Sequence, residues 1–390
     1  MKRLWRCCFA VAAVVGGTTG AAADTPSVEA LLKAFDETAL QRSDFDSKSY
    51  FVRKWTGPLK VSIREIGGDT YGPRVLAGIR RLGVLAGLDV EVLGPEAKEA
   101  NYIVELSSLS GFPSANGLSS CVTYPKWHLD GRMHEVTIKI SIARPDNLDR
   151  CILHEGVHAI GFIWHSHASS TILSYSHHDT DLTPLDVVLI RGLYDKRITP
   201  GMPRLAALTT AKTVFAELIG APASTAADGY IERVIGNMRG DAEAGDSYTQ
   251  IQFGMAREFG QGLPKDETAA VDWYRKAANL GNPQGEFRLG WLLHQGRGVP
   301  RDTAEAAAWY RKAAEANIAI AQNNLGVLLE RGDGVPADPV EAYKWYCVAA
   351  KAQLPIAEGN KKKFAAKLSP EQIAEAERRA AEWKPKERGK

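Results

Sequence analysis

Hydrophobic and polar positions follow different patterns in the two halves of the chain. In the first half, alternating apolar residues predict strands at residues 59–65, 89–93, 102–106 and 135–143. Helical periodicity predicts helices at residues 72–88, 148–162 and 184–194. Strands and helices in this mixed order predict an α+β domain over residues 24–205.

The second half repeats with a period of 36 residues, which separates the three tryptophans of the Trp-Tyr pairs, Trp273, Trp309 and Trp345. Each unit predicts two helices joined by a Gly-x-Gly turn, where glycine permits a positive φ angle. A stack of such pairs forms an α-solenoid, which we expect over residues 229–390 with a polar capping helix at 369–383. Residues 206–228 contain a run of Ala, Pro, Ser and Thr and predict a linker.

The repeat unit resembles a known family of helical repeats. Its pattern of L-G, then G-x-G, then A-x-x-W-Y-x-x-A-A, over about residues 246–354, is similar to the Sel-one-like subgroup of tetratricopeptide-related repeats. The resemblance implies that the solenoid binds a protein partner on its concave face. It also implies that the aromatic pairs belong to the core of the repeats.

Residues 1–23 have the pattern of a secretory signal peptide. A basic start with Lys2, Arg3 and Arg6 precedes a short apolar stretch, and small residues end in an A-x-A pattern at Ala23. The apolar stretch of nine residues is too short to cross a bilayer. We therefore expect cleavage after Ala23, no stable membrane insertion, and a periplasmic or secreted mature protein.

The charge of the chain argues against nucleic-acid binding, and its cysteines indicate which disulfide can form. Without its first 23 residues the chain carries 45 basic and 46 acidic side chains, so no broad surface for nucleic acid is expected. Disulfides persist in exported proteins, and Cys121 and Cys151 lie in one predicted domain, whereas Cys347 lies in a repeat. These positions favour a Cys121–Cys151 bridge with Cys347 as a thiol; three buried thiols are the alternative.

Six of the nine histidines lie between His154 and His178, a clustering that indicates metal binding. Within the cluster, His154 and His158 of the sequence H-E-G-V-H are one helical turn apart and can hold one ion. Glu155 points about 100° away from His154, as suits a general base that does not bind the metal. Gly161 allows a sharp turn after which His165 can be the third ligand of Zn²⁺, with His167 as its competitor.

This segment resembles the metzincin metallopeptidases. H-E-G-V-H-A-I-G-F-I-W-H is similar to their motif H-E-x-x-H-x-x-G-x-x-H, except that Trp164 takes the third histidine's position and His165 follows it. Residues 171–175 resemble the methionine-containing turn, with Leu173 in place of the methionine. The resemblance implies that Tyr175, two residues later, contacts the metal or stabilises the developing oxyanion.

Within that group the chain is most similar to a bacterial family of unknown function with metallopeptidase descent. The similarity rests on Cys151 before the motif, Ser166 after it, and the stretch L-Y-D-x-R-x-x-P-G-M at 193–202. It implies an exported zinc metallopeptidase that hydrolyses peptide bonds in a protein or peptide substrate. The alternative is a non-catalytic periplasmic scaffold in which the repeats bind partners and the first domain is a relic or a structural metal domain.

Overall fold

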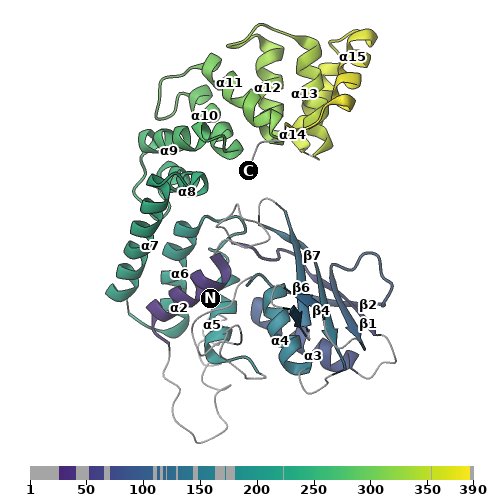
Figure 1. Cartoon of the computed structure of the whole chain (residues 1–390), viewed down its shortest axis with the longest axis vertical. Coiled ribbons are helices and arrows are strands. Elements are labelled where there is room, and N and C mark those ends of the chain that lie inside the picture. Colours follow the sequence, from purple (N-terminus) through teal and green to yellow (C-terminus); the bar gives the residue numbers. More distant parts are fainter. Residues whose placement is uncertain are drawn as a thin grey trace, which may run out of the picture.

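The computed structural model describes residues 26–40, 52–65, 71–108, 112–114, 117–119, 121–128, 131–143, 148–162, 172, 181–222, 224–352 and 354–386. An N-terminal part that mixes strands and helices is followed by a curved row of helices (Figure 1). The predicted order of an α+β region and a helical solenoid is therefore confirmed.

A five-stranded sheet forms the centre of the N-terminal part, with the strand order β2-β1-β3-β7-β6. The strands are β1 (Leu59–Glu65), β2 (Val90–Leu93), β3 (Tyr102–Ser107), β6 (Cys121–Trp127) and β7 (Met133–Ser141). All neighbours pair in parallel except β6, which lies antiparallel to β7 at one edge. A separate short hairpin is made by β4 (Phe112–Ser114) and β5 (Gly117–Ser119). The four predicted strands are present, whereas β6 was not predicted.

Helices α3 (Gly72–Ala86) and α4 (Leu148–Ala159) pack against the apolar side chains of the sheet. Alternate strand residues such as Val104 and Ile138 meet Ile79 and Ile152 in one buried cluster, as the alternating pattern requires. Gly156 permits the close contact of the two helices, because a Cβ atom there would lie 2.4 Å from Leu82. A larger residue at this position would require the buried Leu82 side chain to move.

A second buried cluster joins α2 (Val28–Phe35), α5 (Pro184–Leu193), α6 (Arg204–Ile219) and α7 (Thr225–Glu243). The predicted linker at 206–228 is wrong, since these residues form most of α6 and the start of α7. Phe215 of α6 is fully buried against Phe35 of α2, with ring centroids 5.5 Å apart. Small residues of this stretch, such as Ala207 and Ala211, are buried on α6, which ends at Gly220 in the left-handed conformation.

The solenoid consists of helix pairs that follow the 36-residue period (Figure 1). Its helices are α8 (Ser247–Phe259), α9 (Glu267–Asn279), α10 (Pro283–Gln295), α11 (Thr303–Glu315), α12 (Ala319–Arg331), α13 (Pro339–Lys351), α14 (Pro355–Ala365) and α15 (Pro370–Glu382). Equivalent glycines in α8, α10 and α12 lie against the tyrosine of the following helix; at Gly254 a Cβ atom would lie 2.4 Å from Tyr274. The predicted capping helix corresponds to α15, which opens with a capping box at Ser369 and Gln372.

The two parts of the chain share one buried core. Phe253 and Ala256 of α8 belong to the same cluster as α2, α5, α6 and α7. Arg204 donates its backbone N–H to Gln252 of α8 at 3.2 Å. The first repeat therefore packs directly against the N-terminal part. Among the helices that the structure describes, none combines the length and the apolar character needed to cross a bilayer.

Candidate metal centre

Helix α4 presents the two motif histidines on one face. His154 and His158 are both half-buried, and their ring centroids lie 4.9 Å apart with the rings inclined at 77°. The helix ends directly after them at Gly161, whose φ angle of 121° favours glycine and confirms the predicted sharp turn. Trp55 and Tyr194 hold this end of the helix, because they donate hydrogen bonds to the carbonyls of Ala159 and Ile160.

Backbone carbonyls determine the tautomer of both imidazoles. His154 Nδ1 lies 2.9 Å from the carbonyl oxygen of Ile172, and His158 Nδ1 contacts the carbonyl oxygen of Phe162. A carbonyl oxygen only accepts, so each Nδ1 carries the proton, and in the neutral ring the lone pair is on Nε2. Metal-binding histidines use this arrangement, in which one nitrogen is tied to the protein and the other is the donor to the metal.

The carboxylate of Glu155 lies between α4 and the edge strand β6. Its side chain is 7% exposed, and Oε2 accepts a hydrogen bond of 2.6 Å from the hydroxyl of Thr123. Burial raises the pKa of Glu155, whereas His154 and the Thr123 hydroxyl oppose that shift. A buried carboxylate next to the two histidines, with a raised pKa, is suited to accept a proton.

The predicted disulfide is present and crosses from β6 to α4. Cys121 and Cys151 are bonded, with their Cα atoms 5.8 Å apart. Cys347 is a buried thiol in α13, as expected. The bridge joins the strand that carries Thr123 to the helix that carries Glu155.

Asp186 is a further residue of the site that the sequence analysis did not identify. Both of its carboxylate oxygens lie 3.1 Å from the backbone N–H of Ile172, whose carbonyl accepts the hydrogen bond from His154. Asp186 also forms a capping box with Thr183 at the start of α5. That capping pattern was visible in the sequence, but its connection to His154 depends on contacts between distant segments.

His165, His167 and Tyr175 lie outside the described residues, so their roles remain predictions. In the part of the chain that the structure describes, no group of three or more His, Cys, Asp or Glu side chains could hold a metal ion. The structure thus brings together His154, His158 and Glu155, and it adds Thr123 and Asp186 as residues that hold them. Thr123 was missed because the sequence analysis did not predict β6.

Comparisons with known proteins identify both parts of the chain. The family described as Sel1 repeat matches residues 250–282, 283–318 and 319–354. The family described as Protein of unknown function (DUF2927) matches residues 28–211. No curated protein matches the chain.

Two solved structures are similar to parts of the chain. A Sel1 repeat protein from Oxalobacter formigenes is 34% identical over 34% of this chain and 98% of its own, with a TM-score of 0.32. The protective antigen c5321 of uropathogenic Escherichia coli, described as displaying an SLR fold, is 23% identical over 61% of this chain and 53% of its own, with a TM-score of 0.36. The N-terminal part of the chain is thus similar to a family of unknown function, and the C-terminal part contains three Sel1 repeats.

Proposed function

We propose that the N-terminal domain is a zinc-dependent peptidase and that the Sel1 repeats bind a protein partner or substrate. One observation carries the catalytic proposal: His154 and His158 face the same side of α4 with both Nδ1 atoms tied to backbone carbonyls, beside the buried Glu155. A structural metal site needs ligands but has no use for a carboxylate that is held next to them without joining them.

The residues fit a zinc ion. Two neutral imidazoles with Nε2 lone pairs are typical zinc donors, and His154 and His158 would hold the ion together with His165, or with His167 in its place. Zn²⁺, when bound, supplies a Lewis acid that polarises a peptide carbonyl and makes water a stronger acid. Asp186 keeps His154 oriented through the backbone of Ile172.

Glu155 would perform the proton transfers of hydrolysis. Its carboxylate takes a proton from the attacking water as the new C–O bond forms at the peptide carbonyl. The same proton then passes to the leaving amine nitrogen as the C–N bond breaks, which returns Glu155 to its starting state. Tyr175 is the proposed donor of a hydrogen bond to the oxyanion.

The repeats would serve this enzyme by binding a protein. Sel1 repeats typically mediate protein–protein interaction, and repeat solenoids offer an extended concave surface. The first repeat shares a buried core with the N-terminal domain, so a bound partner would stay at a set position relative to α4. We further propose that the protein acts in the periplasm, since the Cys121–Cys151 disulfide suits an oxidising compartment. A non-catalytic scaffold is the second candidate, and the repeats support it equally.

Zinc content and peptide hydrolysis, measured on the same purified protein, test the proposal. We expect zinc in the parent and in Glu155→Gln, cleavage of casein or a peptide library by the parent only, and loss of cleavage after chelation. His294→Gln in α10 is the matched control, because it removes a histidine outside the site. Zinc without cleavage would support the scaffold, and a protein that binds no zinc would overturn the catalytic proposal.

A further inference from the structure

A disulfide and a side-chain hydrogen bond join edge strand β6 to helix α4 on the same side of the strand. Cys121 is bonded to Cys151, and Thr123 donates its hydroxyl hydrogen bond to Glu155. The strand partners are two residues apart, or about 6.6 Å along a strand. The helix partners are four residues apart, or about 6.0 Å along a helix. Because the two spacings match, the disulfide and the hydrogen bond can form together when the strand and the helix lie side by side in this register.

The hydroxyl of Thr123 orients the carboxylate of Glu155. It lies 2.6 Å from Oε2 and 3.1 Å from the backbone carbonyl oxygen of the same glutamate. The terminal torsion of a glutamate is otherwise broad, so a carboxylate without such a contact samples many orientations. With Oε2 held by Thr123, the other oxygen, Oε1, is the one that is presented as proton acceptor.

The register of β6 depends on more than its backbone pairing. The strand lies at the edge of the sheet, pairs with β7, and has a register irregularity between Lys126 and Trp127. A slip by one residue would turn Thr123 away from α4 and bring in Tyr124, whose side chain is now 42% exposed on the other face. The disulfide prevents this slip, because Cys121 cannot leave Cys151 while the bond is intact.

We infer that Thr123 is a positioning residue for Glu155 and that the Cys121–Cys151 disulfide sets the register in which it acts. The inference rests on the proposed peptidase function, in which Glu155 is the base. It links that function to the redox state of the compartment, since reduction removes the bond that keeps Thr123 opposite the carboxylate.

The contact itself is tested without any activity, on the metal-free protein. A double-mutant cycle combines Thr123→Val with Glu155→Met and measures the urea midpoint of unfolding. We expect Thr123→Val to lower the midpoint in the parent, and to lower it much less when Glu155→Met is already present. Thr137→Val, on the neighbouring strand β7, is the matched control and should give equal shifts in both backgrounds. Additive shifts for Thr123 and Glu155 would overturn the inference.

The role of the disulfide is tested by repeating the cycle in Cys121→Ala/Cys151→Ala. The coupling between Thr123 and Glu155 should fall there, and it should remain in Cys347→Ser. If the variant without this disulfide does not fold, the cycle is repeated on the parent after reduction with a phosphine. Coupling that is unchanged without the bond would show that the disulfide only stabilises the domain.

Kinetics then test the consequence for hydrolysis. Thr123→Val should lower kcat by about 10-fold or more, the scale of one hydrogen bond to a charged group, with KM and zinc content unchanged. Thr123→Ser should restore kcat, and Cys121→Ala/Cys151→Ala should resemble Thr123→Val. Parental kcat in Thr123→Val would overturn the inference. An inactive parent would refute the proposed function instead, while the stability cycle would still decide whether the contact exists.

Discussion

At the scale of single residues, the three repeat tyrosines occupy equivalent positions with different partners. Tyr274 donates its hydroxyl hydrogen bond to Glu258 at 2.8 Å, and Tyr346 donates to Glu330 at 2.9 Å. In the middle repeat His294 stands where the glutamate would be, and its ring meets the Tyr310 ring edge-on at 6.1 Å. The buried Tyr310 hydroxyl contacts the neutral side chain of Asn324 instead of a carboxylate, in a geometry poorer than that of the other two tyrosines. The same tyrosine therefore contributes differently in different repeats.

Removal of the tyrosine hydroxyl should cost more stability where it donates to a glutamate than in the middle repeat. Tyr346→Phe should lower the free energy of unfolding by about 1.5 kcal/mol, because a hydrogen bond to a carboxylate is lost. Tyr310→Phe should change it by less than about 0.5 kcal/mol, or raise it, because only a poorly aligned contact with the neutral Asn324 side chain is removed. Urea unfolding, followed by circular dichroism, measures both. Equal losses for the two variants would contradict this account.

A buried lysine gives a pH dependence at the same scale. Lys54 donates to the carbonyls of Leu193 and Asp195 at 3.2 Å each, and burial lowers its pKa from 10.5 to about 8. The unfolded chain therefore binds more protons than the folded one between these values, so the stability that Lys54 contributes should rise as pH increases from 8 to 10.5. The unfolding free energy of the parent, relative to that of Lys54→Met, should therefore increase as the pH rises from 8 to 10.5. A pH-independent difference would show that Lys54 keeps its ordinary pKa.

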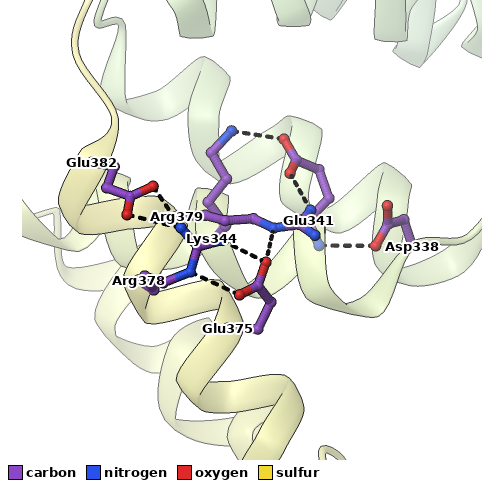
Figure 2. Close-up of polar contacts among 7 residues, drawn as sticks. All are labelled: Asp338, Glu341, Lys344, Glu375, Arg378, Arg379 and Glu382. Carbon is purple, nitrogen blue, oxygen red and sulfur yellow. Dashed lines mark hydrogen bonds and ion pairs between the residues drawn. The ribbon is translucent and has the colours of Figure 1, made fainter.

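At the scale of elements, helix α15 closes the solenoid with one apolar and one charged face. Ala376 and Ala380 are buried in the cluster of the last repeat, and Trp383 meets Trp345 with ring centroids 5.7 Å apart. On the other face, Arg378 and Arg379 pair with Glu375, and Arg378 also pairs with Glu382 (Figure 2). Arg379 also reaches Glu341 of α13 at 3.8 Å, so the charged face contacts the helix beneath. Exposed ion pairs of this kind are weakened by water and salt, whereas the apolar contacts are not.

Substitutions on the two faces should therefore differ in size. Ala376→Glu should lower the stability of the last repeat by more than about 2 kcal/mol, because it forces a charge into a filled core. Glu375→Gln should leave the thermal midpoint almost unchanged at physiological salt. Differential scanning fluorimetry compares the two. A larger loss for Glu375→Gln would mean that the ion pairs hold α15 in place.

At the scale of the whole molecule, α2 joins the N-terminal domain to the repeats. Asp36, which follows this helix and is 1% exposed, accepts two hydrogen bonds from Arg204 at 2.6 and 2.7 Å and one from Tyr230 at 2.7 Å. Its partners belong to α6 and α7, which lie in the same cluster as α8. The buried carboxylate thus connects the start of the described chain with the base of the solenoid.

Loss of this carboxylate should weaken both parts of the molecule. Asp36→Ala should cost about 3 kcal/mol, because part-buried Arg204 and Tyr230 both lose their hydrogen bonds to the buried carboxylate. Hydrogen exchange should then increase in α5 as well as in α8, because both pack on the shared core. Asp149→Ala removes an exposed partner of Arg74 and should leave exchange unchanged in both segments. Faster exchange in α8 alone would mean that the two parts unfold separately.

Prediction from sequence succeeded where the signal is local and periodic. Alternation located β1, β2, β3 and β7, and the 36-residue period located the repeats, which the Sel1 match confirms. Strand β6 was missed because Pro125 interrupts a short stretch that becomes a strand through its pairing with β7. Helix α6 was predicted as part of a linker because its many alanines and threonines give only a weak apolar periodicity. The helix is stabilised by tertiary packing, such as that of Phe215 against Phe35, which the local sequence does not reveal.

The sequence by itself determined the helix pairs of the repeats and the spacing of His154, Glu155 and His158 on one helix, and it favoured the pairing of Cys121 with Cys151 over three thiols. These features depend on residues close in the chain or on the small number of possible partners. The tertiary structure decided that Thr123 holds Glu155 and that Asp186, through Ile172, holds His154. Such contacts join segments that only the packing of the whole domain brings together, so no local pattern could contain them.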